Sequence, residues 1–293
     1  FSIRAIVREK EDWNIVLRRR DVILRLNDHA LAASVYSLPP VVDVHTMAAS
    51  IASDGEGKVY VQDPSHGDIF RIIADNKPLA LFAKVSPGDN GLAFGPNGWL
   101  YIMETQQARI LVRNPDGKIT VTAENIPGYR LTVTHDGNIH AASPGSSPYS
   151  GTIWLVRPNG QKSIVAEGLN GPSGICLTPD GLWLCVAESR GHHAYSYQVQ
   201  ADGGLQYGEP FYWFHVPDSA NDSGAIQVCM DRQGWAYAAT RMGIQVFDRN
   251  GRVTAILPVH GKQLAGICFG DADFQTLYVT TGNAVYRRRI KTA

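Results

Sequence analysis

The chain repeats one short pattern six times, at intervals of about forty residues. Each copy joins a short apolar run, a turn containing Gly or Asp, and a run rich in apolar and aromatic residues. The copies read SIASDGEGKVYVQD, GLAFGPNGWLYIME, LTVTHDGNIHAAS, GICLTPDGLWLCVAES, QVCMDRQGWAYAAT and GICFGDADFQTLYVTT. Their second runs align Tyr60, Tyr101, His140, Cys185, Tyr237 and Tyr278. A unit this short cannot bury its apolar side alone, so neighbouring units must stack.

Each copy is followed by a third strand-like run and usually by a fourth, after a polar turn such as NPDG or RPNG. Apolar and polar residues alternate in runs such as KVYVQD and GIQVFD, which is typical of half-buried antiparallel strands. No long helical pattern competes with this interpretation. Six four-stranded units at this period predict an all-β fold, a six-bladed β-propeller.

The last unit contains only three strand-like runs before the chain ends at Ala293. The N-terminal stretch DWNIVLRRRDVILRLN is strand-like, and we expect it to supply the missing strand or strands and close the ring. Closure removes the exposed edge that a partial blade would leave. The sequence thus predicts one domain over residues 1–293, with closing strands in 1–40 and blades in 45–290.

Composition limits the classes of partner. The formal net charge is zero and the pI is about 7.3, so charge gives no reason to expect nucleic acid or an anionic membrane. No apolar run approaches the roughly 18 residues of a membrane span. We expect a monomer that binds a small organic molecule. Cys176 and Cys185 flank the turn PDG symmetrically and should face each other, either bonded or as small buried thiols.

The propeller geometry predicts where a site would lie. The first strand of each blade lines the central channel, and the N-terminal ends of these strands open on one face. Those ends fall at residues 46–49, 89–90, 129–130, 172–173, 226–227 and 265–266. The loops at 143–151 and 214–224 connect blades on the same face, and the first could act as a lid.

Four stretches resemble the senescence marker protein/gluconolactonase family of six-bladed propellers. They are VTHDGNIH, GPSGICLTPDGLWLCVAES, DSGAIQVCMDRQGWAYAATRMGIQVFDRNGRV and ICFGDADFQTLYVTTGNAVYRR, and the resemblance extends over about residues 45–290. It implies a hydrolase of lactones or related esters with one divalent cation, such as calcium, on the channel axis. The family's ligands are an acid in an E-G-P motif, Asn in N-D, Asn in P-N-G and Asp in D-G-M.

This chain departs from the family at all four ligand positions. The acid of E-G-P falls near residues 49–51, where no carboxylate stands, and N-D falls on Tyr129 and Arg130. The Asn of P-N-G is Ser173, and the Asp of D-G-M is Ile226. A cation beside an unpaired guanidinium is disfavoured. We therefore expect no metal or other cofactor and a remodelled axial pocket.

Three residues are the candidate catalytic set. Arg130 could bind a carboxylate or stabilise an oxyanion, or it could pair with Glu104 or Glu188 and fill the axis. Tyr129 could donate to a substrate carbonyl, act as an acid if Arg130 lowers its pKa, or form an aromatic wall. Gln227 offers a donor and an acceptor, and could hold a polar substrate opposite Tyr129.

The remaining candidates are substrate-binding residues. Asn90, in the retained DNGL, matches a pocket position that often contacts substrate in the family, and Ser173 and Ile226 occupy replaced ligand positions. Glu104 and Glu188 end second strands and could be general bases if desolvated, or salt-bridged blade residues. His45 precedes the first inner strand, as an acid or base or as a rim residue.

The function that the sequence predicts is therefore a small-molecule-binding propeller of gluconolactonase-like ancestry. Its metal-free axial pocket would bind, and could transform, a substrate carrying a carbonyl or carboxylate. One alternative is a metal-dependent lactonase with displaced ligands, drawn from Asn90, Glu104, Glu188 and Asp222. The other is a non-catalytic propeller that binds a ligand or protein through its loop face.

Overall fold

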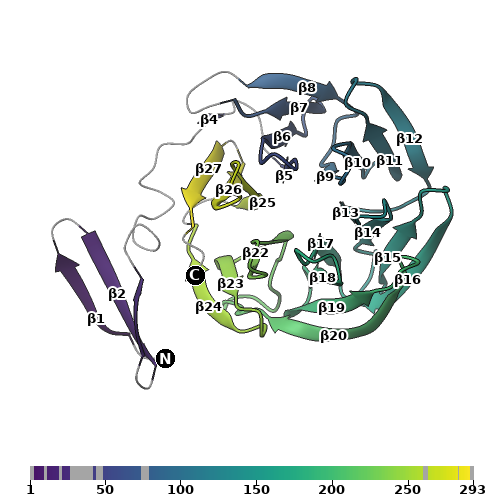
Figure 1. Cartoon of the computed structure of the whole chain (residues 1–293). Coiled ribbons are helices and arrows are strands. Elements are labelled where there is room, and N and C mark those ends of the chain that lie inside the picture. Colours follow the sequence, from purple (N-terminus) through teal and green to yellow (C-terminus); the bar gives the residue numbers. More distant parts are fainter. Residues whose placement is uncertain are drawn as a thin grey trace.

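Six antiparallel sheets form a ring around a central axis in the computed structural model of the chain (Figure 1). The structure describes residues 49–73, 79–259, 263–282 and 284–290, and the backbone of strands at 3–9, 12–19, 22–26 and 42–43. These residues form strands and turns, and no helix among them is long and apolar enough to cross a membrane. The predicted all-β, six-bladed propeller is confirmed.

Each blade is a four-stranded sheet whose strands follow one another outward from the axis. Blades 1 to 3 comprise β5 (Ile51–Ser53), β6 (Val59–Asp63), β7 (Asp68–Arg71) and β8 (Ala80–Lys84); β9 (Gly91–Phe94), β10 (Leu100–Glu104), β11 (Arg109–Arg113) and β12 (Ile119–Glu124); and β13 (Arg130–Val133), β14 (Ile139–Ser143), β15 (Gly151–Val156) and β16 (Lys162–Leu169). Blades 4 to 6 comprise β17 (Pro172–Leu177), β18 (Trp183–Glu188), β19 (His193–Val199) and β20 (Leu205–Trp213); β21 (Gln227–Met230), β22 (Ala236–Thr240), β23 (Gly243–Phe247) and β24 (Val253–Leu257); and β25 (Leu264–Gly270), β26 (Thr276–Thr281), β27 (Ala284–Arg289) and β4 (Val42–Asp43).

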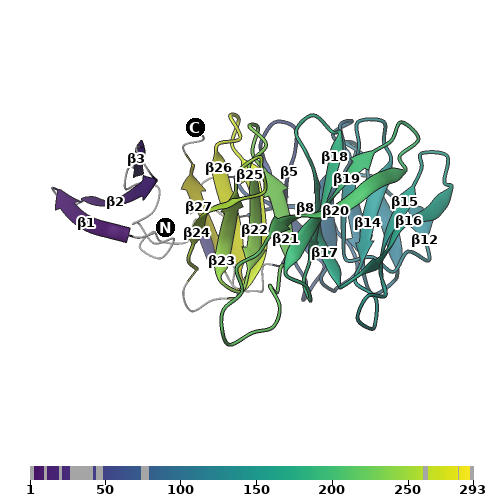
Figure 2. The same cartoon turned by 90° about the horizontal axis from the view of Figure 1, so that it is seen from below.

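The apolar core is divided among the seams between adjacent blades. Six clusters of buried side chains each draw on two neighbouring sheets, such as Met103 with Leu131 between blades 2 and 3. Successive strand residues point to opposite faces, so each sheet contributes to two seams. This explains why the second strands, such as β6 and β10, are buried along their whole length. Seen from the side, the strands cross the thickness of the ring (Figure 2).

The tyrosines that mark the repeat hold the inner hairpins together. Tyr60 donates its hydroxyl hydrogen to Asp54 at 3.0 Å, and Tyr278 donates to Asp271 at 2.7 Å. In each case the acceptor is a turn residue of the hairpin that the tyrosine itself helps to form. At the matching position of blade 3, His140 contacts the carbonyl of Gly203 at 2.7 Å instead.

The strand that completes the sixth blade differs from the predicted one. Val42–Asp43 pairs with β27, whereas DWNIVLRRRDVILRLN forms β2 (Asp12–Arg19) and β3 (Val22–Leu26). These two pair with each other, and β2 also pairs with β1 (Ile3–Glu9), in a separate three-stranded sheet. The expectation that this stretch closes the ring is therefore wrong, because its strands form their hydrogen bonds among themselves.

The cysteine prediction is confirmed in its geometry. Cys176 of β17 and Cys185 of β18 are direct cross-strand partners. Both thiols are free in the structure, as are those of Cys229 and Cys268. Burial and the neighbouring Cys176 thiol raise the pKa of Cys185, with the contact to Cys176 as the largest cause. The two free thiols therefore pack against each other across the hairpin, with Cys185 buried.

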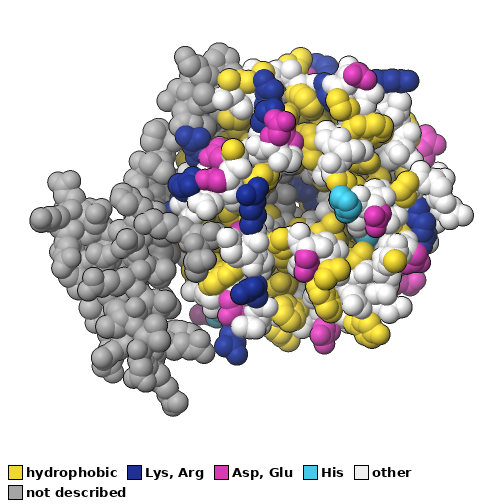
Figure 3. Space-filling view, in the orientation of Figure 1, with side chains coloured by type: hydrophobic (Ala, Val, Ile, Leu, Met, Phe, Trp, Pro, Cys, Tyr) yellow, Lys and Arg dark blue, Asp and Glu magenta, His cyan; other side chains and the backbone are white. Residues whose placement is uncertain are grey.

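The face shown in Figure 3 is hollowed near the centre of the ring. Acidic and basic side chains are interspersed with apolar ones on it, without a continuous basic stripe among the described residues. Opposite charges that alternate in this way leave no extended field of one sign on this face.

The seam between blades 1 and 6 yields a test of how the ring closes. Gly57 has φ of +79°, and a Cβ there would lie 2.0 Å from the carbonyl oxygen of Asp271 across the seam. Gly98, in the equivalent turn of blade 2, has φ of +73° and open space at its Cβ position. Both alanine variants incur the cost of a left-handed residue, about 1–2 kcal/mol. We expect Gly57→Ala to lower the free energy of unfolding by about 1–3 kcal/mol more than Gly98→Ala, because only the first must also displace backbone.

Urea unfolding of the two variants measures this difference. Equal losses of stability would mean that the contact between the Gly57 turn and Asp271 does not hold the seam.

Candidate functional site

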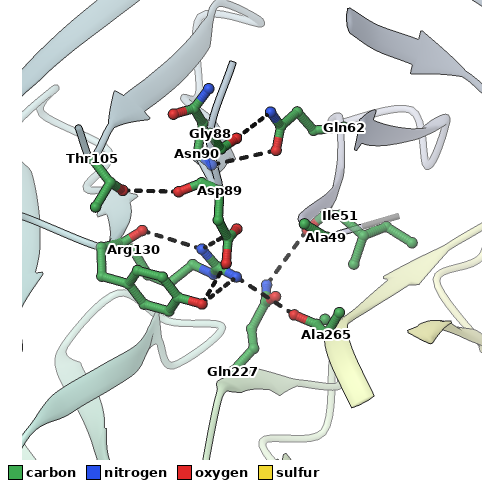
Figure 4. A network of polar contacts seen from close by, with 12 residues as sticks. Ala49, Ile51, Gln62, Gly88, Asp89, Asn90, Thr105, Arg130, Gln227 and Ala265 are labelled. Atoms are coloured by element: carbon green, nitrogen blue, oxygen red, sulfur yellow. Dashed lines mark hydrogen bonds and ion pairs between the residues drawn. The ribbon is translucent and has the colours of Figure 1, made fainter. Parts of the chain in front are cut away.

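Arg130 reaches across the centre of the ring from the start of β13 (Figure 4). Its side chain is 3% exposed. Nη1 donates to Oδ1 of Asp89 and to the carbonyl of Tyr129, both at 3.3 Å. Nη2 donates at 3.5 Å to the carbonyl of Ala265, at the start of the opposite blade. One guanidinium thereby connects blade 3 to blade 6 and to the loop before blade 2.

Asp89 and Tyr129 complete the charged cluster. The Tyr129 hydroxyl donates to Oδ2 of Asp89 at 2.6 Å, while Arg130 Cζ lies 4.1 Å from the centre of the Tyr129 ring. The Asp89 side chain is 38% exposed, so its carboxylate is more accessible to solvent than the guanidinium it binds. We refer to Asp89, Tyr129 and Arg130 as the axial triad.

Opposing effects of burial and neighbouring charges determine the pKa values of Arg130 and Tyr129, and so their protonation states. Burial lowers the pKa of Arg130, but Asp89 and Tyr129 raise it further, so the net shift is upward and the guanidinium stays charged. Burial raises the pKa of Tyr129, and this outweighs the opposite influence of Arg130. The condition for Tyr129 to act as an acid, a pKa lowered by Arg130, is therefore not met. Tyr129 instead remains a protonated hydrogen-bond donor.

Gln227 and Asn90, at the starts of two inner strands, each have a buried polar atom without a partner. Gln227 donates through Nε2 to the carbonyl of Ile51 at 3.4 Å, but its Oε1 is buried and has no partner (Figure 4). Asn90 donates through Nδ2 to the carbonyl of Ser86 at 2.9 Å, and its Oδ1 is also unpartnered. Buried polar groups in this state are usually satisfied by ordered water or a bound ligand. Gln227 therefore offers an unpartnered acceptor at the centre of the ring, whereas the amide of Asn90 points away from Asp89 and Arg130 (Figure 4).

The two candidate glutamates hold blades together and do not meet Arg130. Glu104 pairs with Arg109 and accepts from the amide of Ser86 at 2.8 Å. Glu188, at the equivalent position of blade 4, accepts from the amide of Asn170 at 2.6 Å and contacts His193 at 3.3 Å. Each links its own blade to the loop that precedes that blade. The alternative in which Arg130 pairs with Glu104 or Glu188 is therefore wrong, because the carboxylate that binds Arg130 belongs to Asp89.

Burial raises the pKa of Glu104, but hydrogen bonds from Arg109 and Ser86 lower it more, so its net pKa is below the ordinary value. The Glu104 side chain is also only 1% exposed, and both of its carboxylate oxygens are already bound by Arg109 and Ser86, so it is not placed to meet a substrate or water. Of the two roles that the sequence left open for Glu104, general base or salt-bridged blade residue, the structure therefore favours the salt-bridged residue.

Ser173 uses its hydroxyl to join blades 4 and 5. The hydroxyl lies 2.6 Å from the carbonyl of Ala225 and 3.3 Å from that of Ala187, and the side chain is buried. Ile226 donates its amide to Ala239 at 2.9 Å and packs against the core between blades 5 and 6. His45 lies outside the described residues.

The alternative ligand set does not converge on one point. Asp222 pairs with Arg241 at 2.8 Å, and Glu104 and Glu188 have the partners given above. Within the described ranges, no group of three or more His, Cys, Asp or Glu side chains is placed to hold a metal ion.

The loop at 143–151, which the sequence suggested as a lid, is held in place by Arg190. The Arg190 guanidinium donates to the carbonyls of Pro144, Gly145 and Ser147.

Sequence reasoning placed Asp89 at a strand start but gave it no role. One feature of the sequence could have suggested that Asp89 pairs with Arg130. The acidic Asp89 and the basic Arg130 stand at equivalent positions, the inner-strand starts of two adjacent blades. Residues about forty apart meet here only because consecutive inner strands lie side by side around the ring.

Comparisons with known proteins agree with this architecture. The model of the SMP-30/Gluconolactonase/LRE-like region matches residues 48–283. A gluconolactonase of Zymomonas mobilis is 25% identical over an alignment of 313 positions, which covers 87% of this chain and 84% of that protein.

Solved structures share the fold at lower identity. A gluconolactonase of Xanthomonas campestris superimposes with a TM-score of 0.72 at 20% identity, covering 86% of this chain and 89% of that one. Regucalcin of Agrobacterium tumefaciens, described as a calcium-binding protein, gives 0.65 at 18% identity, covering 88% and 92%. Virginiamycin B lyase of Staphylococcus aureus gives 0.59 at 17% identity, covering 83% and 80%.

The role of Glu104 can be tested by its pH dependence. We expect Glu104→Gln to lower the free energy of unfolding by about 1–3 kcal/mol at pH 7, because Arg109 loses its charged partner. The folded-state pKa of Glu104 is lowered, so its contribution is present above the ordinary pKa of about 4.3 and disappears as pH falls through the folded pKa.

Urea unfolding between pH 7 and pH 3 measures this, with Glu124→Gln, an exposed change on β12, as the control. A loss that stays constant down to pH 3 would contradict a charge-dependent role for Glu104.

Proposed function

Because the chain belongs to the SMP-30/gluconolactonase/LRE-like family, we propose that it hydrolyses a small lactone or related ester at the centre of the ring. In this proposal the axial triad performs the chemistry, and the Arg130 guanidinium supplies the positive charge. The observation that carries the proposal is the buried guanidinium held next to a carboxylate that is 38% exposed. Its relatives, including a gluconolactonase 25% identical to it, support the reaction class.

Arg130 is suited to stabilise the oxygen of a substrate carbonyl as it becomes negative. Its Nη contacts with Asp89, Tyr129 and Ala265 are 3.3–3.5 Å long, beyond the usual range for N–H···O hydrogen bonds. A substrate oxygen can therefore replace one of them at small cost. A fixed charge in a water-poor site acts on the transition state without reorganising, and such a donor typically contributes about 10²–10³ in rate.

Asp89 is the group placed to activate water. Each carboxylate oxygen has a lone pair beyond the one used by Tyr129 or Arg130, so the exposed carboxylate can accept a proton from water. The oxygen of that water bonds to the acyl carbon, and the ring C–O bond then breaks. The proton held by Asp89 passes to the departing alkoxide, which gives a hydroxy acid. Tyr129 keeps the carboxylate oriented throughout.

A divalent cation, which the family implies, fits this position poorly. The centre of the ring already holds a charged guanidinium, and the carboxylate nearest to it is bound to that guanidinium. Calcium needs several oxygen ligands at about 2.3–2.6 Å, and a second cation beside Arg130 would be repelled. We therefore propose that the reaction uses no metal. Hydrolysis that requires a metal held by other oxygens is the competing possibility.

Replacement of Arg130 tests the catalytic proposal. We expect Arg130→Met to lower kcat for lactone hydrolysis by about 10²–10³, because the charge that stabilises the oxyanion is lost. The carboxylate of Asp89 remains solvated, so the fold should survive. Arg157→Met, at an arginine paired with Asp202 away from the centre of the ring, is the matched control. Wild-type kcat in Arg130→Met, measured by pH-stat titration, would overturn the assignment.

Removal of metal tests the cofactor proposal. Dialysis against a chelator should leave kcat and KM unchanged, since no step uses a cation. Elemental analysis of the undialysed protein, combined with the same assay, is the measurement. A stoichiometric divalent cation whose removal abolishes turnover would favour the metal-dependent alternative.

A further inference from the structure

A cavity of about 510 Å³ opens in the seam between blades 4 and 5, which are neighbours in the ring (Figure 1). Three hairpin turns frame it: β17–β18 through Asp180, β21–β22 through Arg232, and β23–β24 through Arg249. Because β17 runs from Pro172 to Leu177, these turns lie at the opposite end of the inner strands from their starts. The cavity is therefore separate from the axial triad, and its volume lies within the range of about 300–1,000 Å³ that is usual for small-molecule sites.

Aromatic side chains form the floor of this cavity. Phe211 and Tyr212 of β20 belong to or pack against the apolar core between blades 4 and 5, with their ring centres 4.9 Å apart. Trp183 of β18, which is 37% exposed, lines the same cavity. A Cβ on Gly251 would lie 2.3 Å from the carbonyl oxygen of Phe211, so the turn that carries Arg249 packs directly on β20. We refer to the three aromatic residues as the aromatic floor, which is formed before any ligand arrives.

The charged side chains at the cavity are sorted by blade. The two carboxylates, Asp180 and Glu209, belong to blade 4, and the two guanidinium groups, Arg232 and Arg249, belong to blade 5. None of the four forms an ion pair within the part of the chain that the structure describes. Arg232 instead lies over the ring of Phe274, with Cζ 4.6 Å from the ring centre. The cavity therefore has an acidic side and a basic side whose charges are not neutralised by each other.

Uncharged polar groups in the lining are also open to a ligand. Tyr212 is only 5% exposed, yet its hydroxyl has no partner among the described residues, and burial raises its pKa, so it stays a hydrogen-bond donor. Ser196 adds a hydroxyl and Gln233 a side-chain amide, both without a partner in the described ranges. Thr178 is excluded, since its hydroxyl donates to Asp180 at 2.5 Å. Donors and acceptors of this kind match a peptide group, which presents one N–H and one C=O.

The separation of charges selects for a ligand that carries both signs. A simple anion would pair with the arginines but lie close to Glu209 and Asp180, and a simple cation would meet the reverse repulsion. A ligand with an ammonium group and a carboxylate can pair with both sides at once. Its apolar part can cover the aromatic floor, which removes apolar area from water.

We infer that this cavity binds a dipeptide with free termini and an apolar side chain. The ammonium group binds on the acidic side at Glu209, the carboxylate binds on the basic side at Arg249, and the apolar side chain packs on the aromatic floor. The peptide group meets the unpartnered hydroxyls and amide. This is a binding function in addition to the proposed hydrolysis, and the two can fail independently because the cavity shares no lining residue with the axial triad.

Isothermal titration calorimetry of the full chain with L-alanyl-L-phenylalanine tests the inference. The N-acetyl derivative of this dipeptide lacks the ammonium group, and its C-terminal amide lacks the carboxylate. We expect each derivative to bind about two- to fivefold more weakly than the dipeptide, because each loses an ion pair that is partly exposed to water. L-alanyl-L-alanine, which has no ring to pack on the aromatic floor, should also bind more weakly.

Two variants assign the termini of the dipeptide to the two sides. Arg249→Gln should weaken binding of the dipeptide by about two- to fivefold and leave the affinity of the amide unchanged, since the amide has no carboxylate to lose. Glu209→Gln should weaken the dipeptide and leave the N-acetyl derivative unchanged for the corresponding reason. Arg252→Gln, on the same turn as Arg249 but outside the lining, and Glu167→Gln, exposed on β16, are the matched controls and should keep the wild-type affinities.

The ligand series alone can overturn the inference. It fails if the wild type gives no saturable heat with the dipeptide, or if the dipeptide binds no more tightly than its two derivatives. It also fails if Arg249→Gln weakens the dipeptide and the amide equally, because the lost contact would then not involve the carboxylate.

Discussion

The ion pair between Arg130 and Asp89 lies at the centre of the ring, where the inner strands of all six blades begin. Burying an unpaired guanidinium costs several kcal/mol, so Arg130 can occupy this place only with a carboxylate and carbonyls around it. Asp89 provides the charge, and the carbonyl of Ala265 provides a contact on the far side. The pair therefore sets the charge available at the centre, and through it blades 2, 3 and 6 are in contact there.

The space at the centre of the ring restricts which residues can stand there, as the charge of Arg130 does. A Cβ on Gly266 would lie 2.9 Å from Oε1 of Gln227, and one on Gly91 would lie 2.6 Å from the carbonyl of Tyr129. The two long polar side chains that cross the centre, Arg130 and Gln227, thus depend on glycines in neighbouring inner strands. Apolar volume is displaced outward, to the seam where Ile226 packs. A polar centre therefore lies beside an apolar seam between blades 5 and 6.

Periodicity in the sequence predicted what depends on local pattern: the six blades, the hairpins and the strand starts that form the candidate site. It did not predict Asp89 as the partner of Arg130, because that contact joins different blades and has no fixed spacing along the chain. Glu104 and Glu188 were plausible partners by charge, yet each is bound by the loop before its own blade. The closing strand was misplaced because DWNIVLRRRDVILRLN has good strand residues, whereas the short Val42–Asp43 carries almost no pattern.

We propose that the Arg130 guanidinium occupies the position where a cation is expected in this family. Anomalous X-ray diffraction from crystals soaked in Mn²⁺ at millimolar concentration tests it most directly. The predicted result is an Arg130 guanidinium bonded to Asp89, with no anomalous peak at the centre of the ring. A peak coordinated by Asp89, with Arg130 turned away from it, would contradict the claim.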